Sequence, residues 1–202
     1  MYYELENFYG SHRNYVKSRS YYQLRGITGK SISDCSPIKE NEDISTTLKN
    51  LNNVLLDKDA DANPCGLIAK YLFTDTYTLA KSGTPVSIDD SKISHSVDRN
   101  SRFKRPSNYK DIQWHDTEDE HLMVWFQTDV FSNFIKLYGK VGTDLEAGTQ
   151  YSLTIDNKFT ISGADIKKYV YFSEANAFGG NNIVFGVIYL AGSGVFFLLA
   201  LV

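Results

Sequence analysis

Residues 183–202 read IVFGVIYLAGSGVFFLLALV, and this stretch decides how the rest of the chain is interpreted. It contains no charged residue, and a helix of this length, at about 1.5 Å of rise per residue, reaches across the ~30 Å hydrocarbon core of a bilayer. Such a helix has no polar stripe to turn toward water. The sequence therefore predicts a C-terminal transmembrane helix, in which Gly192, Ser193 and Gly194 suit close packing against another membrane helix.

Two other interpretations of residues 183–202 stay open. The stretch could be a helix buried in a protein core, or the removable tail of a lipid-anchor signal. The second interpretation lacks the small-residue site and the polar spacer in their usual order. As a transmembrane helix, the stretch divides the chain into a folded domain over residues 1–178, a turn over residues 179–182 and a span over residues 183–202.

The composition of the whole chain is that of a globular protein. Hydrophobic residues make up 42% and charged residues 22% of the chain, and the net charge of -3 argues against a nucleic-acid binder. The aromatic share of 14%, mostly Tyr and Phe, favours β structure. The opening MYYELENFYG has neither the basic start nor the apolar run of a signal peptide. We therefore expect either a tail-anchored protein or a sequence that lacks its own beginning.

Short runs of alternating or apolar residues predict the elements of this domain. Residues 67–73 favour a short buried helix, and residues 131–138 leave strand and helix open. The runs expected to form strands are 2–9 (or a short amphipathic segment), 122–126, 149–155 and 167–172. Strands of this kind, separated by loops, favour an antiparallel arrangement over βαβ units. The predicted fold is mainly β: an antiparallel β-sandwich ectodomain with short helices and long loops, followed by the C-terminal transmembrane helix.

Motifs that would carry chemistry are incomplete. The Gly26–Ser31 segment fails as a phosphate loop because its first glycine stands too close to Gly29-Lys30-Ser31. Residues 57–68 resemble a calcium loop, but Ala62 and Ile68 stand where a glycine and a bidentate glutamate are needed. The cluster from His115 to His121 holds possible metal ligands, although a charged loop between two apolar runs explains it as well. We predict no enzyme activity, no cofactor and no metal.

Several separated blocks of the sequence carry a resemblance to a known family. They are NFYGSHRNYVKSR at 7–19 with Gln23-Leu24, PCGLIA at 64–69 with FTDT at 73–76, Val124-Trp125 with FIKLY at 134–138, Gly148 with YSL at 151–153, and Gly179-Gly180-Asn181 leading into Phe185-Gly186 and Tyr189-Leu190. In this order they resemble the ectodomain of the cell-division-control-protein-50 family. Members of that family are the non-catalytic β-subunits of lipid-flippase P-type ATPases.

The resemblance implies a membrane protein with two spans and a large disulfide-bonded domain. That domain would lie on the exoplasmic side and cover the exoplasmic face of a phospholipid-flippase P-type ATPase, the predicted partner. The two proteins would assemble in order to leave the endoplasmic reticulum and to flip phospholipid, while ATP hydrolysis belongs to the ATPase. We expect this accessory subunit and chaperone in the endoplasmic reticulum, in the Golgi or endosomes, or at the plasma membrane.

The resemblance also implies roles for particular residues. Cys35 and Cys65 are predicted to form a disulfide, because two cysteines of one exoplasmic domain commonly pair in an oxidising compartment; two free buried thiols are the alternative. The positions expected to face a partner or to fix the fold are Arg13, Tyr15, Lys17 and Arg19 in the domain, with Gly192 in the span.

The sequence departs from the family pattern in several places. The first span, an earlier cysteine pair and a cytosolic tail are not in it, so we expect a piece of a longer protein. Thr74-Asp75-Thr76 stands where the family often has an Asn-Asp-Thr glycosylation site, and no Asn-x-Ser/Thr occurs elsewhere. Gln127 stands where an arginine is expected. The alternative function is a single-span cell-surface receptor or adhesion protein with a β-sandwich ectodomain, which would not co-purify with an ATPase.

Overall fold

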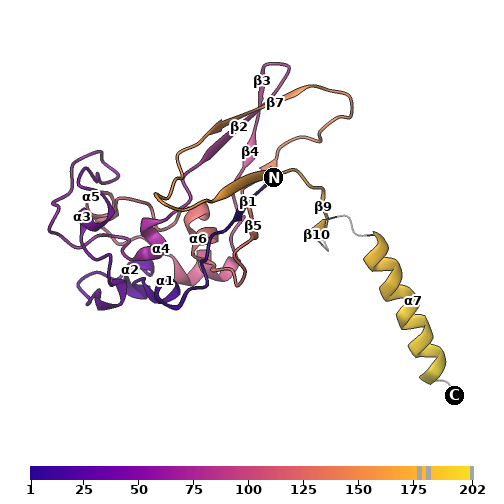
Figure 1. Cartoon of the computed structure of the whole chain (residues 1–202), viewed down its shortest axis with the longest axis horizontal. Coiled ribbons are helices and arrows are strands. Elements are labelled where there is room, and N and C mark those ends of the chain that lie inside the picture. Colours follow the sequence, from indigo (N-terminus) through magenta and orange to yellow (C-terminus); the bar gives the residue numbers. More distant parts are fainter. Residues whose placement is uncertain (177–178, 181–182, 201–202) are drawn as a thin grey trace. The chain divides into compact units, whose positions relative to one another are not determined.

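The structure is a computed structural model that describes residues 1–176, 179–180 and 183–200 (Figure 1). The chain forms two compact units, Met1–Val170 and Tyr171–Val202. The first unit contains nearly all of the predicted ectodomain, and the second contains the C-terminal helix.

The strands form small sheets. In chain order they are β1 (Tyr2–Glu6), β2 (Thr76–Lys81), β3 (Thr84–Val86), β4 (Ile88–Asp89), β5 (Phe134–Leu137), β6 (Lys140–Val141), β7 (Tyr151–Asp156), β8 (Lys167–Tyr171), β9 (Ala175–Asn176) and β10 (Gly179–Gly180). They pair in the orders β5-β1-β8, β3-β2-β7, β4-β6 and β10-β9. Strand β1 is antiparallel to β5, and β2 is antiparallel to both β3 and β7.

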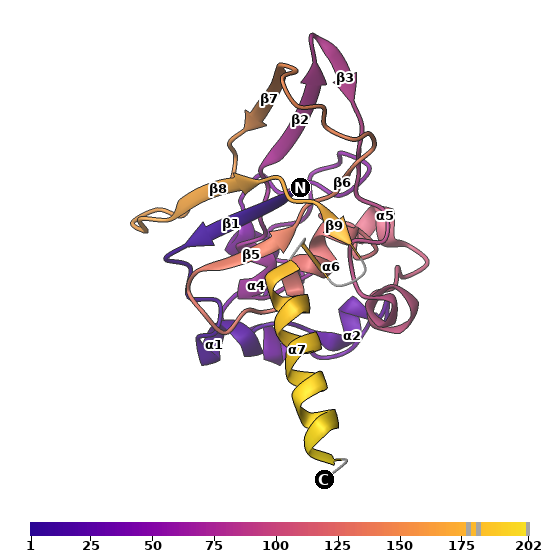
Figure 2. The same cartoon turned by 90° about the vertical axis from the view of Figure 1, so that its right-hand side faces the viewer.

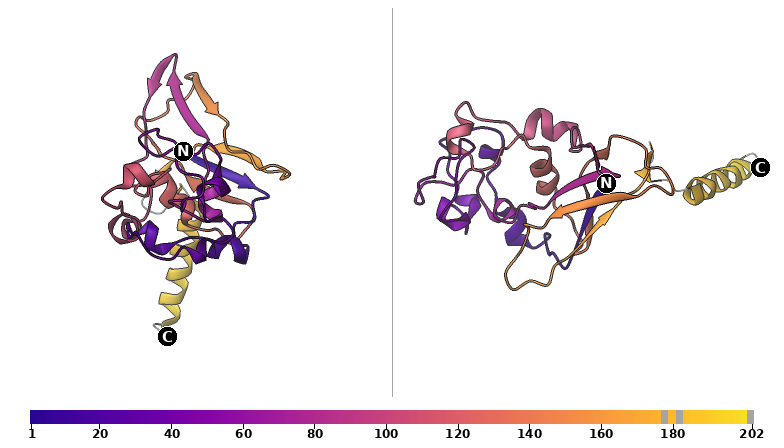
Figure 3. Two further views of the ribbon diagram at one scale, coloured as in Figure 1. Left: turned by 90° about the vertical axis from the view of Figure 1, so that its left-hand side faces the viewer. Right: turned by 90° about the horizontal axis from the view of Figure 1, so that it is seen from above.

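The helices of the first unit are short. They are α1 (Arg13–Lys17), α2 (Tyr21–Leu24), the 3₁₀ turn η1 (Ser33–Cys35), α3 (Asn41–Ile44), α4 (Leu67–Lys70), the π-helical turn η2 (Asp98–Arg102), α5 (Tyr109–Ile112) and α6 (Glu120–Phe126). Figures 2 and 3 show α1, α2 and α4 gathered on the side of the unit away from the β2–β3 hairpin.

The aromatic content of the sequence is concentrated in the core. Strand β1 alternates partly buried and buried side chains, as its sequence predicted, and so turns Tyr3 and Leu5 inward. The ring of Tyr3 stacks on Phe73 with 3.9 Å between centroids. Phe8 contacts Trp125 and Phe134 edge to face at 5.3 and 5.9 Å. Such pairs stabilise a core beyond their buried area, each by roughly 0.5–1.5 kcal/mol.

Helix α6 corrects the prediction that residues 122–126 form a strand. The Asp119 side chain accepts a hydrogen bond from the backbone N–H of His121 at 2.8 Å and caps the first turn of the helix. All residues from Leu122 to Phe126 are buried, so the run has no exposed face and its sequence shows no helical period. By contrast, the short helix α4 and the strands β1, β7 and β8 fall where the sequence predicted them.

The fold class is mixed, which corrects the prediction of a mainly β domain. Helix accounts for 28% of the chain and strand for 20%. The antiparallel pairing was predicted correctly. Face-to-face packing of two sheets, as in a sandwich, stays a prediction.

The second unit contains helix α7 (Ile183–Ala200), with which the predicted span overlaps. No helix formed by the residues that the structure describes is long and apolar enough to cross a membrane. Residues 181–182 of the predicted turn and residues 201–202 of the predicted span lie outside the described residues.

Candidate functional site

A buried disulfide joins η1 to the segment that precedes α4. Cys35 and Cys65 are bonded, their Cα atoms are 5.6 Å apart, and both side chains are buried. This confirms the predicted pairing. Ala62 packs against the two cysteines in a small apolar cluster separate from the main core.

Ser18 connects the N-terminal segment to this disulfide. Its hydroxyl donates to the backbone oxygen of Cys35 and accepts from the backbone N–H of Leu67, both at 2.8 Å. Gly66 packs against the backbone of Ser18, since a Cβ added at Gly66 would lie 2.0 Å from the backbone oxygen of Ser18. The φ of Gly66, +103°, is in the region that favours glycine. The end of α1, the disulfide and the start of α4 are therefore held together.

Gln23 makes the second connection, from α2. Its Nε2 donates to the backbone oxygen of Ala62 at 2.8 Å, and its Oε1 accepts from the backbone N–H of Cys65 at 3.0 Å. Neither Ser18 nor Gln23 is recognisable as a site residue from the sequence. The only signal was that both lie in the blocks that resemble the family, because a polar side chain does not reveal in sequence that it is buried.

The four positions predicted in residues 13–19 separate into two pairs. Arg13 and Lys17, at the two ends of α1, are exposed. Tyr15 turns inward and packs edge to face on Phe8, with 5.5 Å between ring centroids. Burial raises the pKa of the Tyr15 hydroxyl above its ordinary value.

Arg19 is the second inward-facing residue. Its Nη1 donates to the backbone oxygen of Phe126 at 3.0 Å, and its guanidinium lies over the ring of Tyr21 at 5.2 Å. Its Nε is buried without a hydrogen-bond partner. Tyr15 and Arg19 therefore make contacts within the domain, and the roles of all four positions, in fixing the fold or in facing a partner, stay predictions.

Gly192 lies on α7, in the other unit. A Cβ added there would meet no atom within 4 Å. The structure thus provides space beside Gly192, and its role in contact with a partner stays a prediction.

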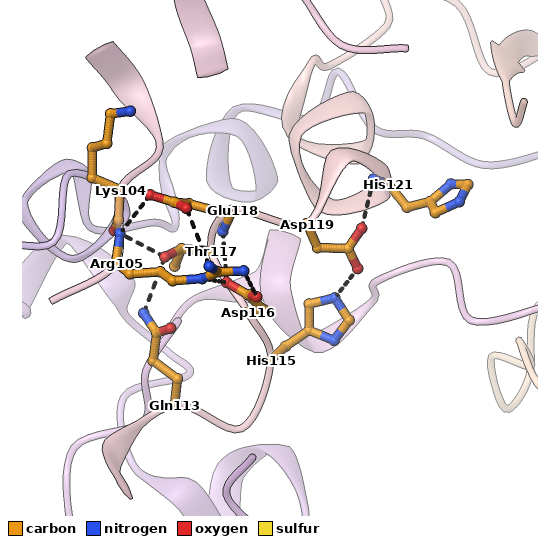
Figure 4. A network of polar contacts seen from close by, with 9 residues as sticks. All are labelled: Lys104, Arg105, Gln113, His115, Asp116, Thr117, Glu118, Asp119 and His121. Atoms are coloured by element: carbon orange, nitrogen blue, oxygen red, sulfur yellow. Dashed lines mark hydrogen bonds and ion pairs between the residues drawn. The ribbon is translucent and has the colours of Figure 1, made fainter. Parts of the chain in front are cut away.

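The acidic cluster around residues 113–121 forms a network of ion pairs and hydrogen bonds (Figure 4). The Arg105 guanidinium makes a two-pronged contact with Asp116, in which Nε donates to Oδ1 at 2.8 Å, and its Nη1 lies 3.4 Å from Glu118. Burial alone would raise the pKa of Asp116, but the hydrogen bond and charge of Arg105 lower it. The carboxylate of Asp116 is thereby kept ionised, and both of its oxygens accept hydrogen bonds from Arg105.

Asp119 joins the two histidines of this cluster to the start of α6. One carboxylate oxygen lies 2.8 Å from His115 Nε2, and the other caps the helix at His121. Burial alone would raise the pKa of Asp119, but the hydrogen bonds and charges of its partners lower it. These acids are engaged with partners of the same chain, which suits structural roles better than acid–base catalysis.

No metal site arises from these histidines among the described residues. The group of three that brings its ligand atoms within 4.8 Å of one another is Glu40, Glu42 and Asp59. All three are exposed acids, a common arrangement on a surface without any ion.

The comparison of the sequence with protein families decides the identity. The profile of the LEM3 (ligand-effect modulator 3) family / CDC50 family matches residues 1–202. The chain belongs to the CDC50 family.

Three relatives show how this CDC50 chain compares with longer proteins. ALA-interacting subunit 3 of Arabidopsis thaliana is 34% identical over 100% of this chain and 57% of its own length. Cell cycle control protein 50A of Mus musculus is 30% identical over 100% of this chain and 62% of its own length. Phospholipid-transporting ATPase accessory subunit CDC50 of Chaetomium thermophilum is 26% identical over 96% of this chain and 52% of its own length. The chain thus spans somewhat more than half the length of these relatives.

The structure shows the contacts or exposure of two positions at which this CDC50 chain departs from the pattern expected for the family. Gln127 donates from Nε2 to Asp98 Oδ2 at 3.1 Å, so an amide holds the buried carboxylate where an arginine was expected. Thr74 is exposed, at the position expected to carry a glycosylated asparagine in the family. The next residue, Asp75, is buried and pairs with Lys168 at 2.5 Å.

Proposed function

We propose that this chain is the ectodomain and C-terminal span of a non-catalytic accessory subunit of a phospholipid-transporting P-type ATPase. The observation that carries this proposal is the match of the CDC50 family along the whole chain. The printed name of the Chaetomium thermophilum relative, an accessory subunit of a phospholipid-transporting ATPase, supports the class of partner. The names of the Arabidopsis thaliana relatives, as interacting subunits, support a role in assembly.

The chain would then act through binding free energy and leave ATP hydrolysis to its partner. The carboxylates of the network in Figure 4 are held by Arg105, His115 and backbone N–H groups, so they support a rigid surface. The exposed ends of α1, at Arg13 and Lys17, would contribute positive charge to the contact with the ATPase. A rigid domain loses little conformational entropy on assembly.

The membrane topology is part of the proposal. Residues 183–202 would cross the bilayer, because their sequence carries no charge and is long enough as a helix. The domain before them would lie on the exoplasmic side, where the Cys35–Cys65 disulfide is stable. Gly192 would allow a helix of the ATPase to approach closely. With this topology, we expect the chain in the endoplasmic reticulum, in the Golgi or endosomes, or at the plasma membrane.

Loss of the gene tests the proposal. In cells without it, we expect a phospholipid-transporting ATPase to accumulate in the endoplasmic reticulum and the inward movement of a fluorescent phospholipid to fall. Re-expression of the gene should restore both. Normal ATPase export and normal lipid movement in the null cells would contradict the proposal and favour the receptor or adhesion alternative.

A further inference from the structure

A groove of about 400 Å³ lies between α2, η2 and the end of α6. Three arginines line it, Arg19, Arg25 and Arg102, together with the aromatic side chains of Tyr21, Phe103 and Phe126. We refer to these six residues as the arginine groove. Its volume is within the range of sites that bind small molecules, and polar groups among apolar walls are typical of such sites.

The backbone holds the walls of the arginine groove in place. Lys104 N–H donates to the backbone oxygen of Leu24 at 2.7 Å, which joins the end of α2 to the segment after η2. Gly26 lies against the same segment, since a Cβ added there would be 2.9 Å from the Arg105 backbone. The rings of Phe103 and Phe126 meet edge to face at 5.8 Å. The site is therefore preformed, and a ligand would not need to order it.

The charge of the arginine groove is positive. The acid in its lining is Asp98, and both of its carboxylate oxygens are occupied: Oδ1 lies 3.2 Å from Arg102 Nη1, and Oδ2 accepts from Gln127 at 3.1 Å. Among the residues that the structure describes, no carboxylate forms an ion pair with Arg19 or Arg25. Two guanidinium groups at one groove thus lack a counter-ion.

The positive charge of Arg19 is only partly compensated by its contacts within the chain. Arg19 is partly buried, and its hydrogen bond to an uncharged carbonyl and its contact with Tyr21 only partly compensate for the desolvation of its charge. Its Nη2 forms no hydrogen bond within the described residues and is not among the buried atoms. An anion in the groove would supply the acceptor and the opposite charge together.

We propose that the arginine groove binds the phosphate group of a small ligand. Guanidinium groups present N–H donors that match phosphate oxygens. Arg25 could donate two parallel hydrogen bonds in this way, and Arg19 could add a hydrogen bond from Nη2, because its Nη1 already donates to Phe126. The aromatic walls would contact the apolar part of a phosphate ester. The phosphate could come from a lipid headgroup or from a soluble phosphate compound, and the chemistry of the groove is the same for both. This ligand site is independent of the proposed assembly with an ATPase.

Calorimetric titration of the purified full chain in a nonionic detergent tests the proposal. The probes are inorganic phosphate, glycerol 3-phosphate and the short-chain lipid dihexanoyl phosphatidic acid. We expect saturable binding of at least one probe. Arg25→Gln should raise its Kd about tenfold or more, because a hydrogen bond to a charged group contributes roughly 1.5–3 kcal/mol. Arg25 is exposed and forms no ion pair among the described residues, so this variant should fold.

Arg13→Gln is the matched control, because Arg13 is an exposed arginine on α1 that does not line the groove. It makes the same change in net charge and should leave every Kd unchanged. Tighter binding of the short-chain lipid than of glycerol 3-phosphate would support a lipid source, and equal binding would support a soluble source. Absence of saturable binding of all three probes, or an equal loss in Arg13→Gln and Arg25→Gln, would overturn the proposal.

Discussion

At the scale of single residues, Gly66 is the described glycine at which an added Cβ would lie closest to another atom. Its φ of +103° strains any other residue, and an added Cβ would collide with the backbone oxygen of Ser18 at 2.0 Å. We expect Gly66→Ala to lower the free energy of unfolding by about 3 kcal/mol or more, measured by chemical denaturation. Gly29→Ala is the control, because Gly29 also has positive φ (+71°) but nothing within 4 Å of an added Cβ. Equal losses in the two variants would show that the Ser18 contact does not constrain the fold.

Asp119 predicts a pH dependence of stability. Burial alone would raise the pKa of Asp119, but the hydrogen bond and charge of His115 lower it below the unfolded value of about 3.9. A carboxylate with a lowered pKa stabilises the fold above its unfolded pKa, and this stabilisation is lost as the pH falls through the folded pKa. We expect the free energy of unfolding to decrease below about pH 4.

The variant that isolates this effect is Asp119→Asn. Asparagine still caps a helix, so α6 should form, but the amide does not titrate. The free energy of unfolding of Asp119→Asn should depend less on pH between about pH 5 and pH 2 than that of the unchanged chain. The same pH dependence in both proteins would assign the acid sensitivity to other groups.

At the scale of elements, prediction from sequence succeeded where alternation or an apolar run had a single interpretation. Strand β1 alternates inward and outward residues, and the run Leu67–Lys70 is bounded by Gly66 and so forms α4. Prediction from sequence failed at α6. Five consecutive buried residues show no helical periodicity of hydrophobic positions, and the residue that caps the helix, Asp119, lies in a cluster that also resembles a charged loop. Burial on every side of a short helix removes the signal that usually identifies it.

The disulfide is the element-scale feature with the largest expected effect. It closes a loop of sequence separation 30 between η1 and α4, which in the chain-entropy model stabilises the fold by roughly 3–4 kcal/mol. We expect Cys65→Ser to lower the melting temperature measured by circular dichroism and to retain the protein in the endoplasmic reticulum. Cys35→Ser should match it, since each variant removes the same bond. If a maleimide labels both thiols of the folded, non-reduced protein, the bridge does not form in solution.

At the scale of the whole molecule, the arginine groove could not be predicted from the sequence. Arg19 and Arg25 are separated from Arg102 by more than seventy residues, and no motif joins them. A backbone hydrogen bond between Leu24, at the end of α2, and Lys104, just after η2, brings these distant segments together, and no sequence pattern predicts it. The sequence also did not reveal that Arg13 and Lys17 are exposed while Tyr15 and Arg19 face inward, since a helix as short as α1 gives no clear periodicity. The family resemblance identified the segment but not the direction of its side chains.

The orientation of the domain can be tested at Thr74. Thr74→Asn creates the acceptor sequence Asn-Asp-Thr at an exposed position. If the domain enters the lumen of the endoplasmic reticulum, this variant should gain a glycan that endoglycosidase removes, seen as a mobility shift in a gel. The double variant Thr74→Asn, Thr76→Ala lacks the acceptor sequence and should show no shift. A folded Thr74→Asn chain without a glycan in glycosylating cells would contradict the exoplasmic orientation.

Co-purification from native membranes tests the central claim most directly. The tagged protein would be extracted in a mild detergent, isolated, and its companions identified from their peptides by mass spectrometry. We expect a phospholipid-transporting P-type ATPase in near-equal amount, and no ATP hydrolysis by the chain when it is purified alone. Isolation of the folded, disulfide-bonded protein without any such ATPase, or ATP hydrolysis by the chain alone, would contradict its role as a non-catalytic accessory subunit.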